Sequence, residues 1–259
     1  MFCAPGNGMR GNARIARFCT RYALRLGAAA LAVSALSGCQ SIDVNSSNAA
    51  LVRVFNASVD STGFDYYTGR TAIVYNLGFS YNTTYVPLNP GTQTVTTDQA
   101  QTTQVLASVA ASLGSQKSYT LITGNVAANL QETIFADQNF AAPSGEIAVR
   151  IINEATRIGP VDVYLVASGG KLSNAIPLAT GVSFGTNTGY IDIPVGTYAV
   201  AVLPTGTPPG SGTTLFTGSQ LSFPTGDAST IIVIDTPLTT SPAANAEVLT
   251  DYQPPTTTG

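Results

Sequence analysis

The residue types that carry most enzyme and metal chemistry are scarce in this chain. It has no histidine in 259 residues, and its three cysteines, Cys3, Cys19 and Cys39, all lie near the start. A Ser-His-Asp triad, a Cys-His pair and most zinc sites need a histidine or several thiolates. The composition therefore argues against these classes, and we predict neither a metal nor a cofactor.

Carboxylates are the remaining candidates for acid–base chemistry. Two pairs lie close together in the sequence, Asp60 with Asp65 and Glu132 with Asp137, and two acids that flank a sugar bond would serve a glycosidase. Asp60 also opens the sequence Asp-Ser-Thr-Gly, which is typical of an ordinary turn. We therefore predict that the protein is not an enzyme, with a carboxylate-dependent carbohydrate-active enzyme as the alternative.

Two arginines occupy equivalent places in apolar segments. Arg53 lies in Val-Arg-Val-Phe-Asn and Arg150 in Val-Arg-Ile-Ile-Asn, where a charged side chain needs a partner or an outward position. The acidic candidates in the same parts of the chain are Asp65 for Arg53 and Asp162 for Arg150. We predict structural ion pairs there, or strand residues that face outward.

Tyrosines are concentrated in one part of the chain. They are Tyr66, Tyr67, Tyr75, Tyr81 and Tyr85. Such a group suits a carbohydrate-binding or protein-binding surface, and it suits cross-strand packing equally well. The sequence leaves both interpretations open.

The charges are separated along the chain. Five of the eleven basic residues are arginines between positions 10 and 25, and all fourteen acidic residues follow position 40. The chain after that point is therefore acidic, whereas nucleic-acid binding depends on basic residues that neutralise phosphates. We do not expect nucleic acid as a partner.

The N-terminal segment has the order of an export signal. Residues 1–25 carry five arginines and no acidic residue, and they are followed by the apolar run Leu26–Leu36. At about 1.5 Å per helical residue, this run is too short for a hydrocarbon layer of about 30 Å. It therefore fits a signal peptide better than a membrane span, with Met1 or Met9 as the start.

The apolar run ends in Leu-Ser-Gly-Cys, which resembles the lipobox of bacterial lipoproteins. The resemblance implies cleavage between Gly38 and Cys39 and a diacylglycerol on the thiol of Cys39, which would anchor the protein firmly. Gln40, by resemblance to proteobacterial sorting, favours the outer over the inner membrane. The alternative is an ordinary secretory leader that is cut near Ala35-Leu36-Ser37.

Blocks of sequence recur in the same order, which indicates an internal duplication. The matching blocks are Val52–Asn56 with Val149–Asn153, Phe64–Tyr67 with Val161–Tyr164, Tyr85–Thr92 with Tyr190–Thr197, Tyr119–Ile122 with Thr230–Val233, and Ile134–Asp137 with Val248–Asp251. The extra residues of the second unit fall in segments of turn composition, Ser168–Ser173, Pro204–Thr213 and Thr236–Ala244. Loops tolerate such insertions, whereas paired strands do not.

The duplication predicts how the chain is divided. We expect a lipoprotein signal peptide at 1–38, a lipidated cysteine and flexible tether at 39–50, a first repeat at 51–144 and a second at 146–255. Since no disulfide is possible with one cysteine left after cleavage, each repeat must be held by apolar packing.

The periodicity within each repeat is that of strands. Apolar and polar residues alternate in Val52–Asn56 and Thr197–Val202, and Thr230–Ile234 resembles a fully buried strand. Val105–Leu113 has a helical spacing, but its counterpart Leu215–Phe223 contains a glycine and few helix formers, so we predict a strand there. The predicted fold is all-β: two tandem immunoglobulin-like β-sandwich domains of about seven strands each.

The repeat resembles domain-of-unknown-function family 4397. The similarity lies in the opening phrase at Val52–Ser58, in Asp-x-Tyr at Asp65 and Asp162, and in the Pro-Gly-Thr turn at Pro90–Thr92. The resemblance covers both repeats, roughly residues 51–255, and it provides no assigned catalytic role that can be carried over to Asp65 or Asp162.

Together these features predict a non-enzymatic, membrane-anchored lipoprotein of the bacterial cell envelope whose tandem sandwiches act as binding or spacer domains. Its expected partners are the membrane, through the lipid on Cys39, and an unidentified protein or glycan. A purely structural role in adhesion or envelope assembly is a further alternative, which exposed strand edges would favour.

Overall fold

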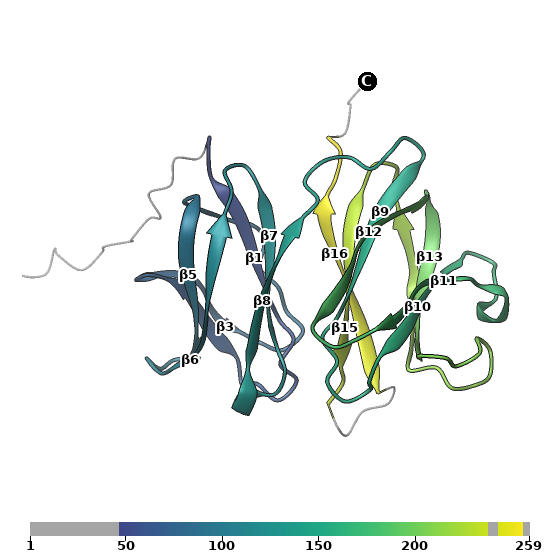
Figure 1. The fold of residues 1–259 in the computed structure, drawn as a ribbon, viewed down its shortest axis with the longest axis horizontal. Helices are drawn as coiled ribbons and strands as arrows, with labels where there is room; N and C mark the ends of the chain where they lie inside the picture. The colour runs from purple at the N-terminus through teal and green to yellow at the C-terminus, as the bar shows by residue number, and fades with distance from the viewer. Residues whose placement is uncertain (1–46, 238–242, 256–259) are drawn as a thin grey trace, which may run out of the picture. The chain divides into compact units, whose positions relative to one another are not determined.

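The computed structural model describes residues 47–237 and 243–255 (Figure 1). Regular structure in these residues is β-strand apart from two short 3-10 turns, Ala127–Asn129 (η1) and Leu172–Asn174 (η2). The predicted all-β class is therefore confirmed. No helix in these residues is long and apolar enough to span a membrane. The predicted signal peptide, with Gly38 and Cys39, lies outside the described residues.

The first half of the structure contains eight strands, and so does the second. The first eight are β1 (Ala50–Asn56), β2 (Phe64–Thr68), β3 (Thr71–Leu77), β4 (Val86–Leu88), β5 (Gly91–Gln99), β6 (Val105–Leu113), β7 (Ser118–Gly124) and β8 (Gln131–Asp137). The others are β9 (Glu146–Asn153), β10 (Val161–Ala167), β11 (Pro177–Val182), β12 (Thr186–Pro194), β13 (Gly196–Pro204), β14 (Phe216–Phe223), β15 (Ala228–Asp235) and β16 (Ala244–Tyr252).

Both halves arrange their strands in the same way. The first half has two four-stranded sheets, ordered β4-β1-β7-β8 and β3-β2-β5-β6, and the second has β12-β9-β15-β16 and β11-β10-β13-β14. In each half the first and seventh strands pair in parallel, whereas the other neighbours are antiparallel. The topology thus repeats strand for strand, with one strand more per half than the sequence predicted.

The ambiguous apolar stretch is a strand. Val105–Leu113 forms β6, and its counterpart forms β14. Two of the predicted insertions also lie in loops. They correspond to the long connections at 168–176 and 205–215 of the second half. Helical spacing in such a short segment is outweighed by pairing with a neighbouring strand, here β5.

Each half has its own apolar core between its two sheets. Val52 and Val54 of β1 point into the first core, and Val149 and Ile151 of β9 point into the second. Alternate residues of a strand point to opposite faces. Arg53 and Arg150 therefore lie on the other face of the same sheets.

That other face is also buried, because the two halves share a third apolar cluster. Phe55 and Ile122 of the first half pack with Ile152, Ile232 and Ile234 of the second, all fully shielded from solvent. The sheets that contain β1 and β9 are consequently covered on both sides. This explains why Thr230–Ile234 is an unbroken buried run.

Candidate functional site

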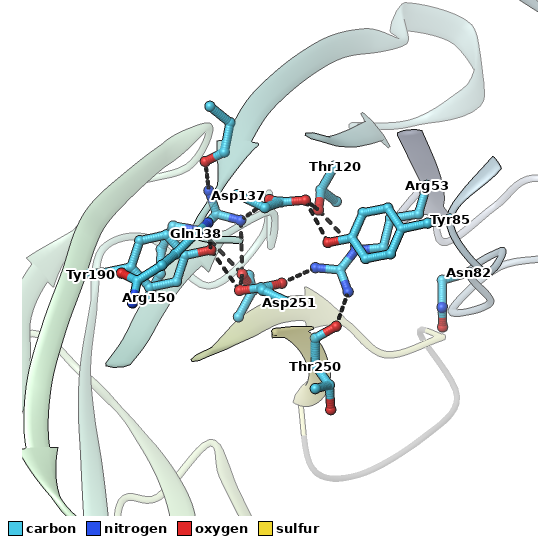
Figure 2. Close-up of polar contacts among 12 residues, drawn as sticks. Arg53, Asn82, Tyr85, Thr120, Asp137, Gln138, Arg150, Tyr190, Thr250 and Asp251 are labelled. Carbon is cyan, nitrogen blue, oxygen red and sulfur yellow. Dashed lines mark hydrogen bonds and ion pairs between the residues drawn. The ribbon is translucent and has the colours of Figure 1, made fainter. Parts of the chain in front are cut away.

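Two arginines form the centre of a buried polar cluster where the halves meet (Figure 2). Arg53 of β1 donates through Nε to Oγ1 of Thr120 at 2.9 Å and through Nη1 to the carbonyl oxygen of Thr250 at 2.8 Å. Its Nη2 forms an ion pair with Asp251 of β16. The guanidinium also lies over the ring of Tyr85, 5.0 Å from the centroid.

Arg150 of β9 repeats these contacts in the opposite direction. It donates through Nε to Thr230 at 3.1 Å, through Nη1 to the carbonyl oxygen of Ala136 at 2.9 Å, and through Nη2 to Asp137 of β8 at 2.5 Å. Its guanidinium lies 4.8 Å from the ring centroid of Tyr190. Each half therefore supplies the arginine that binds the aspartate of the other half.

The aspartates are held in place by their own halves. Asp137 accepts hydrogen bonds from the hydroxyls of Tyr85 and Thr120 at 2.8 and 2.7 Å. Asp251 accepts the equivalent bonds from Tyr190 and Thr230, both at 2.6 Å. These hydrogen bonds orient each carboxylate toward the arginine of the other half, which favours a strong charge-assisted contact.

The contacts within the cluster indicate a structural role. The arginine side chains are 4% and 3% exposed, and those of the aspartates are 0% exposed, so no substrate reaches the charges. Burial raises the pKa of both Tyr85 and Tyr190, which keeps their hydroxyls protonated as donors. Two cations face two anions, so the buried charge is balanced.

The structure corrects the partners that the sequence suggested for the arginines. Asp65 lies on β2 and Asp162 on β10, in the sheets of each sandwich that do not contain Arg53 or Arg150. The arginines point away from those sheets and toward the other half. Sequence reasoning missed Asp251, because it considered partners within one repeat only.

Asp65 and Asp162 instead hold turns together. Asp65 accepts the backbone N–H groups of Asn76 and Gln101 at 2.7 and 3.0 Å. Asp162 accepts those of Gly181 and Gly206 at 2.8 and 3.0 Å. All four donors have a positive φ, so the aspartate at the Asp-x-Tyr position fixes two left-handed turn residues in each half.

The carboxylate pairs considered for glycosidase chemistry do not form paired sites. Asp60 accepts the N–H of Ala127 at 2.8 Å, which is the bonding of a loop residue. Glu132 and Asp137 lie five residues apart on β8, a separation of about 16 Å at roughly 3.3 Å per residue. Two glycosidase carboxyls are about 5 to 9.5 Å apart.

Two glutamates are buried, which the sequence did not predict; Glu132 was considered there only as part of a pair with Asp137. Glu132 accepts hydrogen bonds from the hydroxyls of Thr97 and Thr123, and burial raises its pKa to about 7. Burial raises the pKa of Glu154 to about 8, and its Oε1 has no hydrogen-bond partner among the described residues. Glu154 replaces the Ala57 of the first half, which was the only sequence signal.

The tyrosines are divided between packing and surface. Tyr66 is fully buried in the first core, and Tyr85 belongs to the polar cluster. Tyr67 and Tyr75 form an edge-to-face pair with centroids 5.9 Å apart, and the ring of Tyr75 is largely exposed. Tyr81 is exposed in the loop before β4. Packing therefore accounts for Tyr66 and Tyr85, whereas Tyr75 and Tyr81 are exposed and remain available for a binding surface.

The outer faces of the equivalent sheets differ between the halves. In the first half, Tyr67 is paired across the strands with Thr96, and both are accessible. In the second, the corresponding pair is Tyr164 and Ala201, and both are buried. The loop that contains η2 covers them, since Leu172 packs on this face.

The same loop borders an open cavity in the second half. The cavity has a volume of about 670 Å³ and is lined mainly by apolar side chains from both sheets, among them Leu165, Leu178, Ile193 and Tyr198. Lys171 is the charged residue among those that line it. In residues 47–237 and 243–255, no three acidic, histidine or cysteine side chains gather as a metal site would require.

Comparison with solved structures gives weak similarities. One is a structure described as "Alpha-glucan binding by a streptococcal virulence factor", with 10% identity, a TM-score of 0.24, and coverage of 70% of this chain and 91% of that one. Another is the family 26 carbohydrate-binding module of Eubacterium rectale Amy13K in complex with maltoheptaose, with 11% identity, a TM-score of 0.25, and coverage of 80% and 98%. TM-scores this low support no conclusion about fold or ligand.

Comparison by sequence is more informative. No curated protein matches the chain. Residues 50–164 match the family model described as "Domain of unknown function (DUF4397)". The match begins with β1, spans the first half and ends within β10. The chain therefore contains one DUF4397 domain, at residues 50–164.

Proposed function

We propose that this protein is a non-enzymatic, lipid-anchored component of a bacterial cell envelope that displays a glycan-binding β-sandwich module. The open outer face of the sheet β3-β2-β5-β6 carries the binding part of the proposal. At the centre of the equivalent face in the second half, the loop that contains η2 covers apolar side chains, whereas the first half has polar side chains there that remain accessible to solvent.

The chemistry of this face suits a neutral sugar. Tyr75 is 66% exposed, and its ring offers an apolar surface for the C–H face of a sugar. The ring of Tyr67 packs against it edge to face. Thr94 is exposed beside Thr96 and opposite Ala110, and Thr96 is opposite Ser108. Hydroxyls both donate and accept, as recognition of sugar hydroxyls requires.

The two halves would be displayed as one rigid unit. The shared apolar cluster and the reciprocal ion pairs cross from one half to the other, and Ala142 of the connecting segment is itself buried. A rigid module holds its binding face in a fixed orientation relative to the second half. We also propose that the sandwiches are immunoglobulin-like and that DUF4397 similarity extends to the second half.

The binding part is tested with the soluble portion, residues 40–259, on a glycan microarray, with titration of every hit. Tyr75→Ala should weaken binding roughly tenfold, about 1.4 kcal/mol. Tyr81→Ala is the matched control, because Tyr81 is 69% exposed but belongs to a different segment. Equal losses for both variants, or no hit on the array, would refute the glycan proposal.

The anchoring part is tested separately in cells. Metabolic labelling with an alkyne fatty acid should label the protein when it is expressed from the full sequence, and it should not label a Cys39→Ala variant. The variant should also be lost from the membrane fraction. We expect the label in the outer-membrane fraction. An unlabelled protein of full length, with its leader intact, would contradict the lipoprotein assignment.

The observed geometry also favours a spacer role as a second candidate. A buried interface between the halves is what a stiff extension needs, and it does not depend on a ligand. If no glycan binds and the Arg53 and Arg150 variants alone impair the envelope, the spacer role would be preferred.

A further inference from the structure

The cavity of the second half exists because of a local insertion. In the first half, β2 and β3 are joined by a tight turn at Gly69 and Arg70. In the second half, the equivalent strands β10 and β11 are joined by residues 168–176, several of which line the cavity. A tight turn would have completed the strand pair, so the longer connection adds something that the fold itself does not need.

The walls of the cavity reach into the sandwich. Leu165, Leu178 and Ile193 line it and also pack against the core cluster of the second half. They come from both sheets, since β10 and β11 belong to one and β12 to the other. The cavity is therefore an opening between the two sheets, where an apolar group can contact the core directly.

The rim of the cavity exposes apolar surface to solvent. Ile176 is 85% exposed. Val195 follows the cavity-lining Pro194 and is 45% exposed, and Leu221 lies opposite the cavity-lining Tyr198 and is 40% exposed. Exposed apolar residues that gather around a concavity are typical of ligand sites. A ligand in the cavity would cover Ile176.

Polar contacts are confined to the same rim. Lys171 and Asn174 belong to the inserted loop, and both are exposed. Lys171 carries the positive charge of the site, and an ammonium group of this kind attracts a carboxylate or a phosphate. A volume of about 670 Å³ lies within the range of small-molecule sites, roughly 300 to 1,000 Å³.

We propose that this cavity binds an anionic amphiphile, with its hydrocarbon chain against Leu165, Leu178 and Ile193 and its acidic headgroup beside Lys171. The site is separate from the glycan-binding face of the first half and does not depend on it. An amphiphile suits both the apolar walls and the basic rim, whereas a neutral sugar would have to bury its hydroxyls against apolar walls without hydrogen-bond partners.

The test is isothermal titration of residues 40–259 with octanoate, decanoate and dodecanoate below their micelle concentrations. A buried methylene contributes up to about fourfold in affinity. We therefore expect one bound molecule per chain and an affinity that rises at least tenfold from octanoate to dodecanoate. Dodecyltrimethylammonium, with the same chain and the opposite charge, should bind at least tenfold more weakly.

Three variants locate the site. Ala167→Trp fills the cavity from an exposed position at the end of β10 and should abolish binding. Lys171→Gln should weaken dodecanoate about tenfold and should not weaken the cationic amphiphile, because it removes a like charge. Ile176→Asp should weaken dodecanoate, whereas Val105→Asp, the same type of change at an exposed residue of the first half, should not.

The outcomes separate clearly. No binding at millimolar dodecanoate, equal binding to all variants, or equal effects of the two aspartate substitutions would overturn the proposal. Loss of dodecanoate binding in Ala167→Trp together with retained glycan binding would support both sites independently. Equal binding of the two headgroups would show an apolar site without a role for Lys171, which also contradicts the proposal.

Discussion

The ion pairs between the halves give the sharpest prediction. Replacing Arg53 by Met leaves Asp251 buried with its own tyrosine and threonine but without its ion-pair partner. Removing one partner of a buried pair costs about 3 to 5 kcal/mol, because the remaining charge is unpaired. For a folded unit of this size, each kcal/mol lowers Tm by about 2 to 4 °C, so we expect a loss of about 10 °C.

A double-mutant cycle identifies the partner. Arg53→Met and Asp251→Asn are made singly and together, and the free energy of unfolding is measured by urea denaturation. Residues in direct contact show coupling energies of about 0.5 to 3 kcal/mol, and we expect about 2 kcal/mol here. The second cycle uses Asp65→Asn, and its coupling with Arg53 should lie within about 0.5 kcal/mol of zero.

A third cycle uses the symmetry of the cluster. Arg150 and Asp137 form the equivalent contact, so their coupling energy should be of similar size. Calorimetry of Arg53→Met should also show a broadened or divided transition, because the halves then unfold less cooperatively. If Arg53 couples more strongly to Asp65 than to Asp251, the described interface between the halves is incorrect.

Three further predictions concern stability. Gln101 has a positive φ and its counterpart is Gly206, so Gln101→Gly should stabilise the protein by up to about 1 kcal/mol and Gly206→Ala should destabilise it by about as much, as measured by urea denaturation. Burial raises the pKa of Glu154 from 4.5 to about 8 in the folded state, so the folded state binds an extra proton between these two values. The free energy of unfolding therefore falls as pH rises from about 4.5 to about 8, and Glu154→Gln should make Tm depend less on pH in this range. Oδ1 of Asp98 is buried and has no hydrogen-bond partner within the described part of the chain, whereas the second half has Leu203 at this position, so Asp98→Leu should raise Tm, and a fall would contradict this account.

Much of the fold could be predicted from the sequence, because strand alternation and turn composition are local properties. The alternation in Val52–Asn56 and the turn composition of Ser168–Ser173 lie in residues that are close together in the chain, whereas the Val105–Leu113 strand was predicted from its counterpart in the second repeat. The recurrence of Val-Arg-x-x-Asn also indicated that Arg53 and Arg150 have the same role. That role is indeed the same in both halves.

The partners of these arginines could not be predicted, because they depend on how one sandwich packs against the other. Alternation places Arg53 on the face opposite Val52, but it does not say whether that face meets solvent or protein. Asp251 lies almost two hundred residues away in sequence. The cavity was missed for a similar reason, since Lys171 and Ile193 are brought together only by the sheets.

The polar cluster also explains why the two halves depend on each other. Each half presents an arginine, an aspartate and an apolar patch on the same face, so each face is complementary to a copy of itself. Reciprocal contacts of this kind are those of an isologous dimer, here joined in one chain through residues 138–145. An isolated half would expose Phe55 and its apolar patch to water, which is unfavourable, and it would lose the ion pair between Arg53 and Asp251. The rest of each sandwich has no such constraint, and there the two halves differ: the first has an open polar outer face, and the second has an apolar cavity between its sheets.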